Sequence, residues 1–197
     1  MFHIVSNNAG LDFVNTLIVD AGKPVDLLNG FEDLVDWSVA AGLVTSSDGR
    51  RMVRKWKGTS AAERVFKNAL GLRDSLKQIT DEVTRGRLAS KPALDAVNDI
   101  LKRKSGFFEI RKDGDAYSKS FHSEQDDITG LLVPIAESMA DLLCFGDLAH
   151  VKKCENEACV LYFYDTSKNH RRRWCSMAAC GNRAKASAFY RRKTGQG

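Results

Sequence analysis

The 197-residue chain lacks the features that would place it in a membrane or carry it across one. No apolar run approaches the roughly 20 residues that a helix needs to span a bilayer. The N-terminus has no basic segment followed by a long apolar stretch, as a secretory signal peptide would. Internal repeats and low-complexity segments are absent as well. With 43% hydrophobic and 28% charged residues, we expect a globular cytoplasmic protein with no membrane partner.

A recognisable catalytic constellation is also lacking. Residues 1–150 contain no nucleophile paired with a base and no phosphate-binding loop. Asp12 and Asn15 are three positions apart, so they would share one face of a helix, where they could form structural hydrogen bonds or bind a ligand. We therefore expect a protein that is not an enzyme. An enzyme of unknown reaction in residues 1–150 remains an alternative, with its polar candidates being Asp12, Asn15, His3, His122 and Asp20.

Periodicity in residues 1–150 predicts a mostly helical body with a few strands. Apolar residues recur at helical spacing in five segments, which are 31–40, 46–56, 60–83, 91–101 and 128–143. Ser46 or Ser47 is expected to cap the second of these helices, Ser60 and Glu63 to form a capping box on the third, and Pro134 to kink the last. Strands are expected at 2–5, 106–110 and 116–121, whereas 11–18 fits either a helix or a strand. Cys144, on an apolar helix, is expected in the core.

Residues 33–56 also fit a helix-turn-helix motif. Segments 33–41, 42–45 and 46–56 have suitable lengths, and the second helix would carry Arg50, Arg51, Arg54 and Lys55. Two core helices with basic outer faces would produce the same pattern. We prefer that simpler interpretation and keep the motif as a second route to DNA.

Four of the five cysteines lie within 27 residues, in the pattern Cys154-x4-Cys159-x15-Cys175-x4-Cys180. Clustered cysteines in a reducing compartment bind metal more often than they form disulfides, and zinc favours four thiolates in a tetrahedron. A segment of about 45 residues has a small hydrophobic core and usually needs a bound metal ion or a disulfide to fold. We predict one structural Zn²⁺ on these four cysteines, with metal-free cysteines or replacement of one ligand by His170 as alternatives.

The segment around these cysteines predicts a treble-clef-like zinc finger. A hairpin in the 15-residue spacer, with a strand at 160–164, would separate the two cysteine pairs, and a helix would follow Cys180. Because no Asp, Glu or His is placed to leave an open coordination position, the predicted site is structural rather than catalytic.

Positive charge is concentrated in the same segment. Residues 151–197 contain eleven Lys and Arg and three acidic residues, a net +8, so the remainder of this +5 chain carries −3. A fixed cluster of cations binds the phosphates of a duplex, and Arg and Asn side chains can also contact bases. The predicted nucleic-acid-binding residues are Arg171, Arg172, Arg173, Asn182, Arg183, Lys185, Arg191, Arg192 and Lys193. Asn182 and Arg183 are equally suited to holding the finger together.

RNA binding is an alternative function of the finger. Tyr162, Phe163, Tyr164 and Trp174 could stack on unpaired bases. Packing around the metal is the interpretation that we prefer for these aromatic residues.

Two motifs resemble known families. Cys180-Gly181-Asn182-Arg183 reads CGNR and, with Trp174-Cys175-Ser176-Met177, resembles the CGNR zinc-finger family of bacterial proteins. The segment 11–16, LDFVNT, resembles the start of the ABATE domain, which precedes this finger in stress-induced transcription regulators. The resemblance implies zinc on the four cysteines, a treble-clef-like fold, DNA binding and a regulatory α/β N-terminal domain.

Together these observations predict an α+β protein of two parts that pack together. Residues 1–150 form an ABATE-like domain that senses a small-molecule effector or a partner, and residues 151–197 form a CGNR-type zinc finger that docks on DNA. A homodimer is compatible with this arrangement.

Overall fold

The structure, a computed structural model, describes residues 2–123 and 128–193, without the side chains of residues 120–123, 191 and 192. The α-helices are α1 (Ala9–Val14), α2 (Phe31–Ala40), α3 (Ser46–Trp56), α4 (Ser60–Val83), α5 (Lys91–Leu101), α6 (Val133–Phe145) and α7 (Asn182–Lys193). The strands are β1 (Leu17–Asp20), β2 (Lys23–Asp26), β3 (Gly106–Asp113), β4 (Ala116–Ser123), β5 (Val151–Lys153) and β6 (Tyr162–Tyr164). Shorter helical segments are the 3-10 helices η1 (Ile128–Leu132) and η2 (Leu148–His150) and the π-helix η3 (Met177–Gly181). The predicted α+β class, mostly helical with a few strands, is confirmed.

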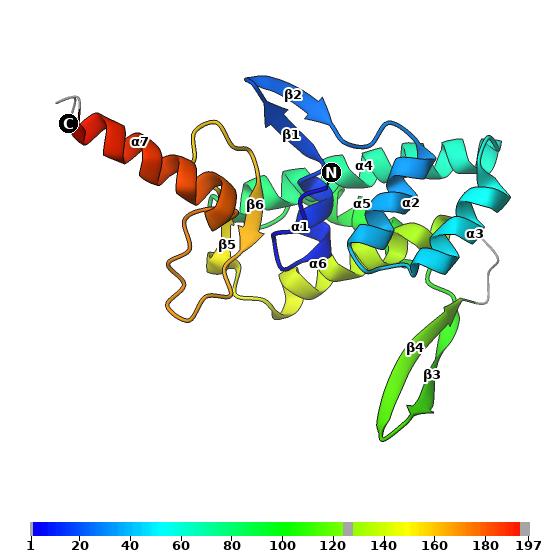
Figure 1. Cartoon of the computed structure of the whole chain (residues 1–197). Coiled ribbons are helices and arrows are strands. Elements are labelled where there is room, and N and C mark those ends of the chain that lie inside the picture. The colour runs from blue at the N-terminus through cyan, green and yellow to red at the C-terminus, as the bar shows by residue number, and fades with distance from the viewer. Residues whose placement is uncertain (1, 124–127, 194–197) are drawn as a thin grey trace.

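The short helix α1 lies at the centre of the body, where it packs against α4 and α6 (Figure 1). Five of its six residues are buried, and the ring of Phe13 lies 4.8 Å from that of Trp37 on α2. Because α1 is buried on nearly every side, it has no polar outer face, and apolar periodicity could not distinguish a helix from a strand at residues 11–18. The chain forms a helix to Val14 and then the β1–β2 hairpin. The strand predicted at 2–5 is wrong, since no strand pairs with this segment among the described residues.

The helices predicted at 31–40, 46–56, 60–83 and 91–101 are confirmed, but two of their caps are one residue off. Thr45 caps α3, and Thr59 caps α4 by accepting a hydrogen bond from the backbone N–H of Ala62 at 3.2 Å. Both threonines have the extended backbone of an N-cap residue, so the adjacent serines become the first helical residues. The predicted capping box at Ser60 is therefore wrong.

The stretch Ile128–Phe145 has a mean hydropathy of 1.6 and is by length and composition apolar enough to cross a membrane. A core helix of a globular protein can have the same length and apolar composition. Its inner side chains, among them Leu132, Ile135 and Met139, are buried against the other helices. Pro134 lies in the first turn of α6, where its missing N–H costs no hydrogen bond, so it starts the helix instead of kinking it.

The expectation that Cys144 is a core residue is wrong, because its side chain is exposed. On a helix, position 144 is turned about 200° from Leu142, and so faces away from the buried side of α6.

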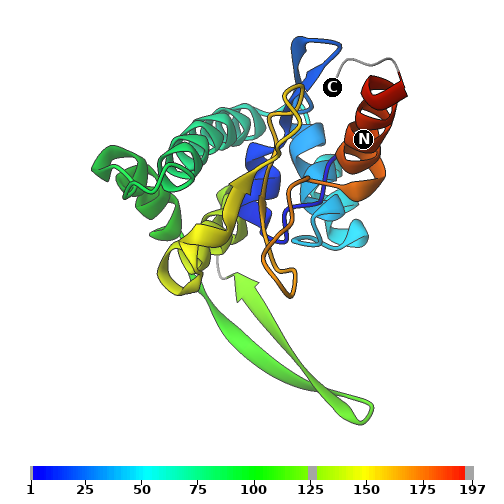
Figure 2. The ribbon, with the colours of Figure 1, turned by 90° about the vertical axis from the view of Figure 1, so that its left-hand side faces the viewer.

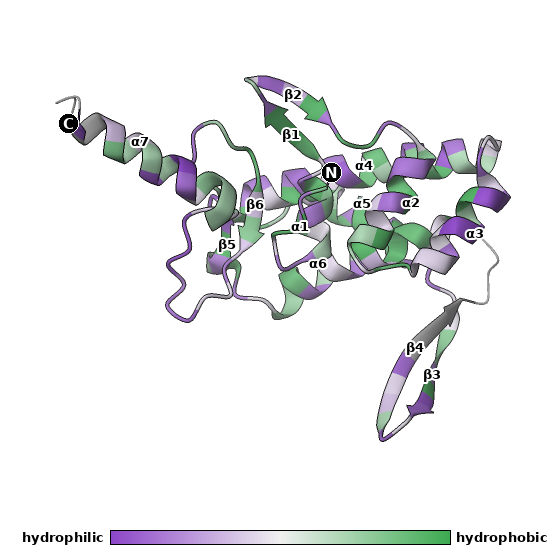
Figure 3. Cartoon of the chain, viewed as in Figure 1, coloured by the Kyte–Doolittle hydropathy of each residue, from purple (hydrophilic) through white to green (hydrophobic). Residues whose placement is uncertain are grey.

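Among the described residues, three separate two-stranded antiparallel sheets complete the fold. The β1–β2 hairpin and the β5–β6 hairpin border the body, whereas the longer β3–β4 hairpin projects away from the helices (Figures 1 and 2). Helix α7 points away from the body at the end remote from β3–β4. Hydrophilic residues dominate the loop between β6 and η3 (Figure 3).

Candidate metal centre and nucleic-acid interface

The four clustered cysteines come together in space. Their sulfur atoms all lie within 4.8 Å of one another, with Cys175 Sγ at 3.8 Å from Cys159 Sγ and 3.7 Å from Cys180 Sγ. Four sulfurs bound to one zinc at about 2.3 Å in a tetrahedron are separated by about 3.8 Å. These separations are far longer than the roughly 2.05 Å of a disulfide bond, and all four thiols are free. The donor set and its spacing therefore fit a tetrahedral metal ion.

The β5–β6 hairpin positions the first cysteine pair. Lys153 is the last residue of β5, so Cys154 and Cys159 lie in the turn that leads back into β6. The predicted strand at 160–164 exists as β6, but it pairs with a strand before Cys154 and not with residues of the spacer. The spacer hairpin is therefore wrong, because the partner strand lies at the end of the body, outside the cysteine window.

The CGNR motif has a physical role at each of its four positions. Cys180 supplies a sulfur, and Gly181 lets the side chain of Met177 lie close, since a Cβ there would lie 2.6 Å from Met177 Sδ and would displace it. Asn182 donates to the backbone oxygen of Ala178 at 3.3 Å, and Arg183 donates to Cys180 Sγ at 3.7 Å. The alternative that Asn182 and Arg183 stabilise the finger is thus consistent with their contacts.

Thiol pKa values in the cluster are shifted in opposite directions. A hydrogen bond from Cys175 lowers the pKa of Cys159 to about 5, and the same contact with burial raises the pKa of Cys175. Burial raises the pKa of Cys154. Burial and the neighbouring sulfurs thus disfavour the charged forms of Cys154 and Cys175, which is the electrostatic situation that a divalent ion relieves.

His170 does not join the sulfur cluster. Its ring stacks on that of His150 at 3.6 Å, and its Nδ1 lies 2.9 Å from the backbone oxygen of Asp165. Ligand replacement by His170 therefore finds no support in this geometry.

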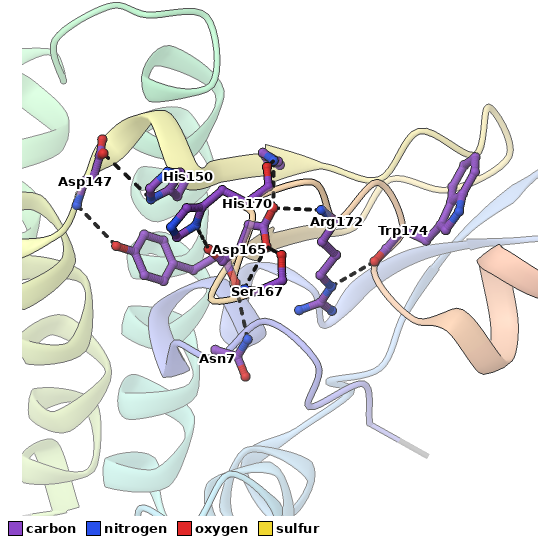
Figure 4. Close-up of polar contacts among 10 residues, drawn as sticks. Asn7, Asp147, His150, Asp165, Ser167, His170, Arg172 and Trp174 are labelled. Carbon is purple, nitrogen blue, oxygen red and sulfur yellow. Dashed lines mark hydrogen bonds and ion pairs between the residues drawn. The ribbon is translucent and has the colours of Figure 1, made fainter.

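Asp165 is the polar centre of the loop that follows β6 (Figure 4). Its fully buried carboxylate accepts hydrogen bonds from Lys152 Nζ at 2.7 Å, Ser167 Oγ at 2.6 Å, the Ser167 backbone at 3.0 Å and the Arg172 backbone at 2.9 Å. Burial alone would raise the pKa of Asp165, but these donors hold it far below its usual range. Asp165 was not among the predicted site residues, although its position as an acidic residue within a basic segment is a signal in the sequence.

The three consecutive arginines do not share one role. Arg172 is half-buried over the ring of Phe163 and donates to the backbone oxygens of Val5 at 2.8 Å, Trp174 at 2.9 Å and Cys175. Arg173 forms an exposed ion pair with Glu155 at 2.6 Å. Arg171 is exposed. Arg172 thus has a structural role in the finger, whereas Arg171 and Arg173 are exposed to solvent.

The exposed cations gather around a hollow of about 610 Å³ on the finger. Lys168, Arg171, Arg173, Trp174 and Met177 are among the residues that line it. On α7, Arg183, Lys185 and Lys193 are exposed, whereas the side chains of Arg191 and Arg192 lie outside the described residues. Of the aromatic residues considered for stacking on RNA, Tyr162 and Phe163 are buried and Tyr164 is half-buried, so Trp174 offers the most accessible ring near the hollow.

Asn15 joins the body to the finger. Its side-chain amide donates to the backbone oxygen of Tyr162 at 2.8 Å and accepts from the Tyr162 N–H at 2.9 Å, as a neighbouring strand would. The hydroxyl of Tyr162 donates to Asp81 on α4, and burial together with this carboxylate raises the Tyr162 pKa. As predicted, the two parts pack together. Asn15 is committed to the β6 backbone and is not available to a ligand.

The N-terminal segment completes this junction. Asp12 Oδ1 accepts the backbone N–H groups of Val5 and Ser6, each at 2.9 Å, and burial raises the Asp12 pKa in spite of these bonds. The oxygen of Ser6 in turn accepts the N–H of Tyr164 at 2.8 Å. Asp12 thus orders a segment that lies against β6.

Asp12 also borders an open cavity of about 660 Å³ between the N-terminal segment and α6. Glu137 and Asp141 contribute two more carboxylates, and Ile4, Asn7 and Asn8 line the opposite side. The other polar residues considered for catalysis do not add to it: His3 and Asp20 are exposed elsewhere, and the side chain of His122 lies outside the described residues.

Helices α2 and α3 pack closely, as the simpler interpretation of residues 33–56 requires. A Cβ on Gly49 would lie 2.7 Å from Val39 Cγ2, so this glycine permits the contact. Arg50, Arg51, Arg54 and Lys55 all lie on the exposed side of α3, and Arg51 pairs with Asp48 at 2.8 Å.

Comparison with known proteins assigns both parts of the chain. Residues 7–146 match the ABATE family, described as "Putative stress-induced transcription regulator", and residues 150–193 match the CGNR zinc finger. No curated protein is significantly similar to the chain. Both matched families are of regulatory or zinc-finger type. The chain therefore belongs to the ABATE family and carries a CGNR zinc finger, with its cluster of four cysteines, at its C-terminal end.

Proposed function

We propose that the protein is a transcription regulator that binds duplex DNA through a zinc-ordered finger. The observation that carries this proposal is the charge of the segment that the cysteines organise. Residues 166–193 contain nine Lys and Arg and no Asp or Glu. A cation surface without acids binds the phosphates of DNA independently of sequence.

Two elements are suited to different parts of the duplex. The hollow beside Arg171 and Lys168 is concave and cationic, which suits the sugar–phosphate backbone. Helix α7 projects from the body, so it can reach a groove without a clash from the rest of the chain (Figure 1). Lys185, and Arg183 where it is not engaged with Cys180, are the residues that we expect nearest the bases.

Replacing Lys168 and Arg171 together by Ala should weaken DNA binding and reduce its salt dependence. Loss of two phosphate contacts lowers the magnitude of the slope of log K against log salt concentration by about 2. The slope is measured by fluorescence anisotropy with a random duplex at several salt concentrations. Because both side chains are exposed, the thermal stability should not change.

The matched control is replacement of Arg50 and Arg54 on α3 by Ala, which removes the same charge from the surface of the alternative helix-turn-helix. A loss confined to the α3 variant would move the interface to that motif. Preference for single-stranded RNA over the duplex in competition would replace DNA by RNA as the partner.

We also propose that the cavity beside Asp12 receives the effector. Asp141 lines it with an exposed carboxylate, beside the buried Asp12 and beside Glu137, which pairs with Lys104, so a small cationic molecule such as an amine fits its charge. The segment that lines it also holds the finger, because Val5 accepts from Arg172 and Asn7 donates to the Tyr164 oxygen at 3.2 Å. A ligand that shifts this segment would therefore change how the finger is held.

Spermidine is a suitable probe for this cavity. It should raise the melting temperature of the wild type, and the increase should be lost in Asp141→Asn, which removes one exposed carboxylate of the cavity. Asp74→Asn, an exposed carboxylate on α4 outside the cavity, is the control. An equal increase in all three proteins would mean that spermidine binds elsewhere and would count against a cationic effector.

A further inference from the structure

Helix α7, residues 182–193, receives little support from the rest of the protein. Of its ten residues with described side chains, eight are exposed and two, Ala184 and Ala188, are half-buried. Each of the helices α1 to α6, in contrast, buries at least one residue. The helix also points away from the body (Figure 1). Packing against a core therefore contributes little to the stability of α7.

The length and charge of α7 make it a marginal helix by itself. It has 12 residues, and isolated helices shorter than about 12–15 residues are only marginally stable in water. Five of its residues are cationic and none is acidic, so no pair of opposite charges four positions apart can support it. Its alanines favour a helix, and η3 supplies the turn from which it continues. We therefore expect α7 to fray from its C-terminal end.

A DNA duplex can supply the support that the body does not. The major groove of B-DNA is about 12 Å wide and admits an α-helix. Lys185 and Phe189 are four positions apart, so a formed helix presents both side chains on one face. Phosphates beside the groove attract the cation, and Phe189, which is 57% exposed, is the kind of apolar side chain that contacts the methyl group of thymine. Binding in the groove therefore stabilises the helix more than the frayed form.

We propose that α7 is partly frayed in the free protein and completes its helix in the major groove of a DNA duplex. This inference rests on the proposed function and adds to it the way in which the finger engages its partner. The observed affinity then equals the affinity of the formed helix multiplied by the fraction of the free protein in which the helix is formed. Helix propensity in α7 therefore changes the affinity even at positions that make no contact with DNA.

Hydrogen exchange of the full-length, metal-loaded protein tests the proposal. The amides of residues 186–193 should exchange at least about tenfold more slowly with a saturating random-sequence DNA duplex than in the free protein. An RNA duplex of the same sequence should give no such protection, because the major groove of A-form RNA is deep and narrow. Unchanged exchange on bound DNA, or equal protection by the two duplexes, would overturn the proposal.

Ser187, which is exposed on α7, allows a matched pair of variants. Ser187→Ala and Ser187→Gly both remove the hydroxyl and keep the charge, but glycine disfavours a helix relative to alanine. Ser187→Gly should therefore bind duplex DNA about fourfold more weakly than Ser187→Ala, with the same salt dependence, in fluorescence anisotropy. Its residues 186–193 should also exchange faster in the free protein. Equal affinities, or unequal affinities without a difference in exchange, would contradict coupled helix formation.

Gly71→Ala on α4 is the control for a general effect of helix propensity. Gly71 is exposed, and a Cβ there would meet no other side chain within 4 Å. The change should raise the melting temperature and leave DNA binding unchanged, whereas a changed affinity would count against α7 as the helix that sets it. If Lys168→Ala with Arg171→Ala weakens binding but the Ser187 pair does not differ, this inference alone fails. A protein that binds no duplex would refute the proposed function as well.

Discussion

Removal of the metal should unfold the finger and abolish DNA binding while the helical body stays folded. The finger has its own small core, whose buried residues are Cys154, Leu161, Phe163, Cys175 and Cys180. With three cysteines among five residues, this core is too poor in apolar surface to stand alone. Structural zinc contributes on the order of 10 kcal/mol to such a fold. Chelation, or Cys175→Ser, should therefore expose residues 165–193, as measured by amide hydrogen exchange and by binding to a duplex.

Strands β5 and β6 should respond less than the rest of the finger. Val151 and Tyr162 belong to the core of the body, and Asn15 holds β6 from the other side. Cys144→Ser is the matched control, since this exposed thiol lies outside the cluster. A finger that keeps its protection against exchange after both chelation and Cys175→Ser would show that the metal is dispensable.

Asp165→Asn should destabilise the protein by about 3 kcal/mol at neutral pH, because it leaves the half-buried ammonium of Lys152 facing an uncharged amide. The depressed pKa of Asp165 fixes the sign of the pH dependence. Its contribution is complete above the unfolded-state pKa of about 3.9 and is lost as pH falls towards the lower folded value. In urea titrations, the gap between wild type and variant should therefore shrink below about pH 4.

Asp147→Asn serves as the comparison for this prediction. Asp147 also accepts a backbone hydrogen bond, but its side chain is 62% exposed, so the change should cost less than about 1 kcal/mol. Equal stability of Asp165→Asn and the wild type at pH 7 would contradict the role of Asp165 as the polar centre of the loop.

Features of the chain that depend on local pattern could be predicted from the sequence. Helices α2 to α5 follow from apolar periodicity, and the β3–β4 hairpin follows from its turn at Gly114. The four cysteines could be grouped because their spacing alone suits one ion. Each of these conclusions required only residues that are close in the chain.

The missed features depend on contacts between distant segments. Arg171, Arg172 and Arg173 are equivalent in sequence, yet Arg172 turns inward because Val5, 167 residues away, offers it a carbonyl oxygen. Asn15 is distinguished by Tyr162, which lies 147 residues further along the chain. Local patterns carry no information about such partners, so the division of the basic residues into structural and exposed ones needed the fold.

The same long-range contacts hold the helical body and the finger together. The N-terminal segment is fixed by Asp12 on one side and gives its carbonyl oxygens to Arg172 and Tyr164 on the other. A change in the body that moves this segment must break or strain contacts with the finger. This geometry is the physical basis on which regulation of the finger by the body is proposed.

X-ray absorption at the zinc K-edge of the purified protein tests the central claim most directly. The account predicts one zinc per chain, surrounded by four sulfur atoms at about 2.3 Å and by no nitrogen or oxygen. A coordination shell containing nitrogen or oxygen, or a folded finger that holds no metal, would contradict the assignment of Cys154, Cys159, Cys175 and Cys180 as the ligands that order the finger.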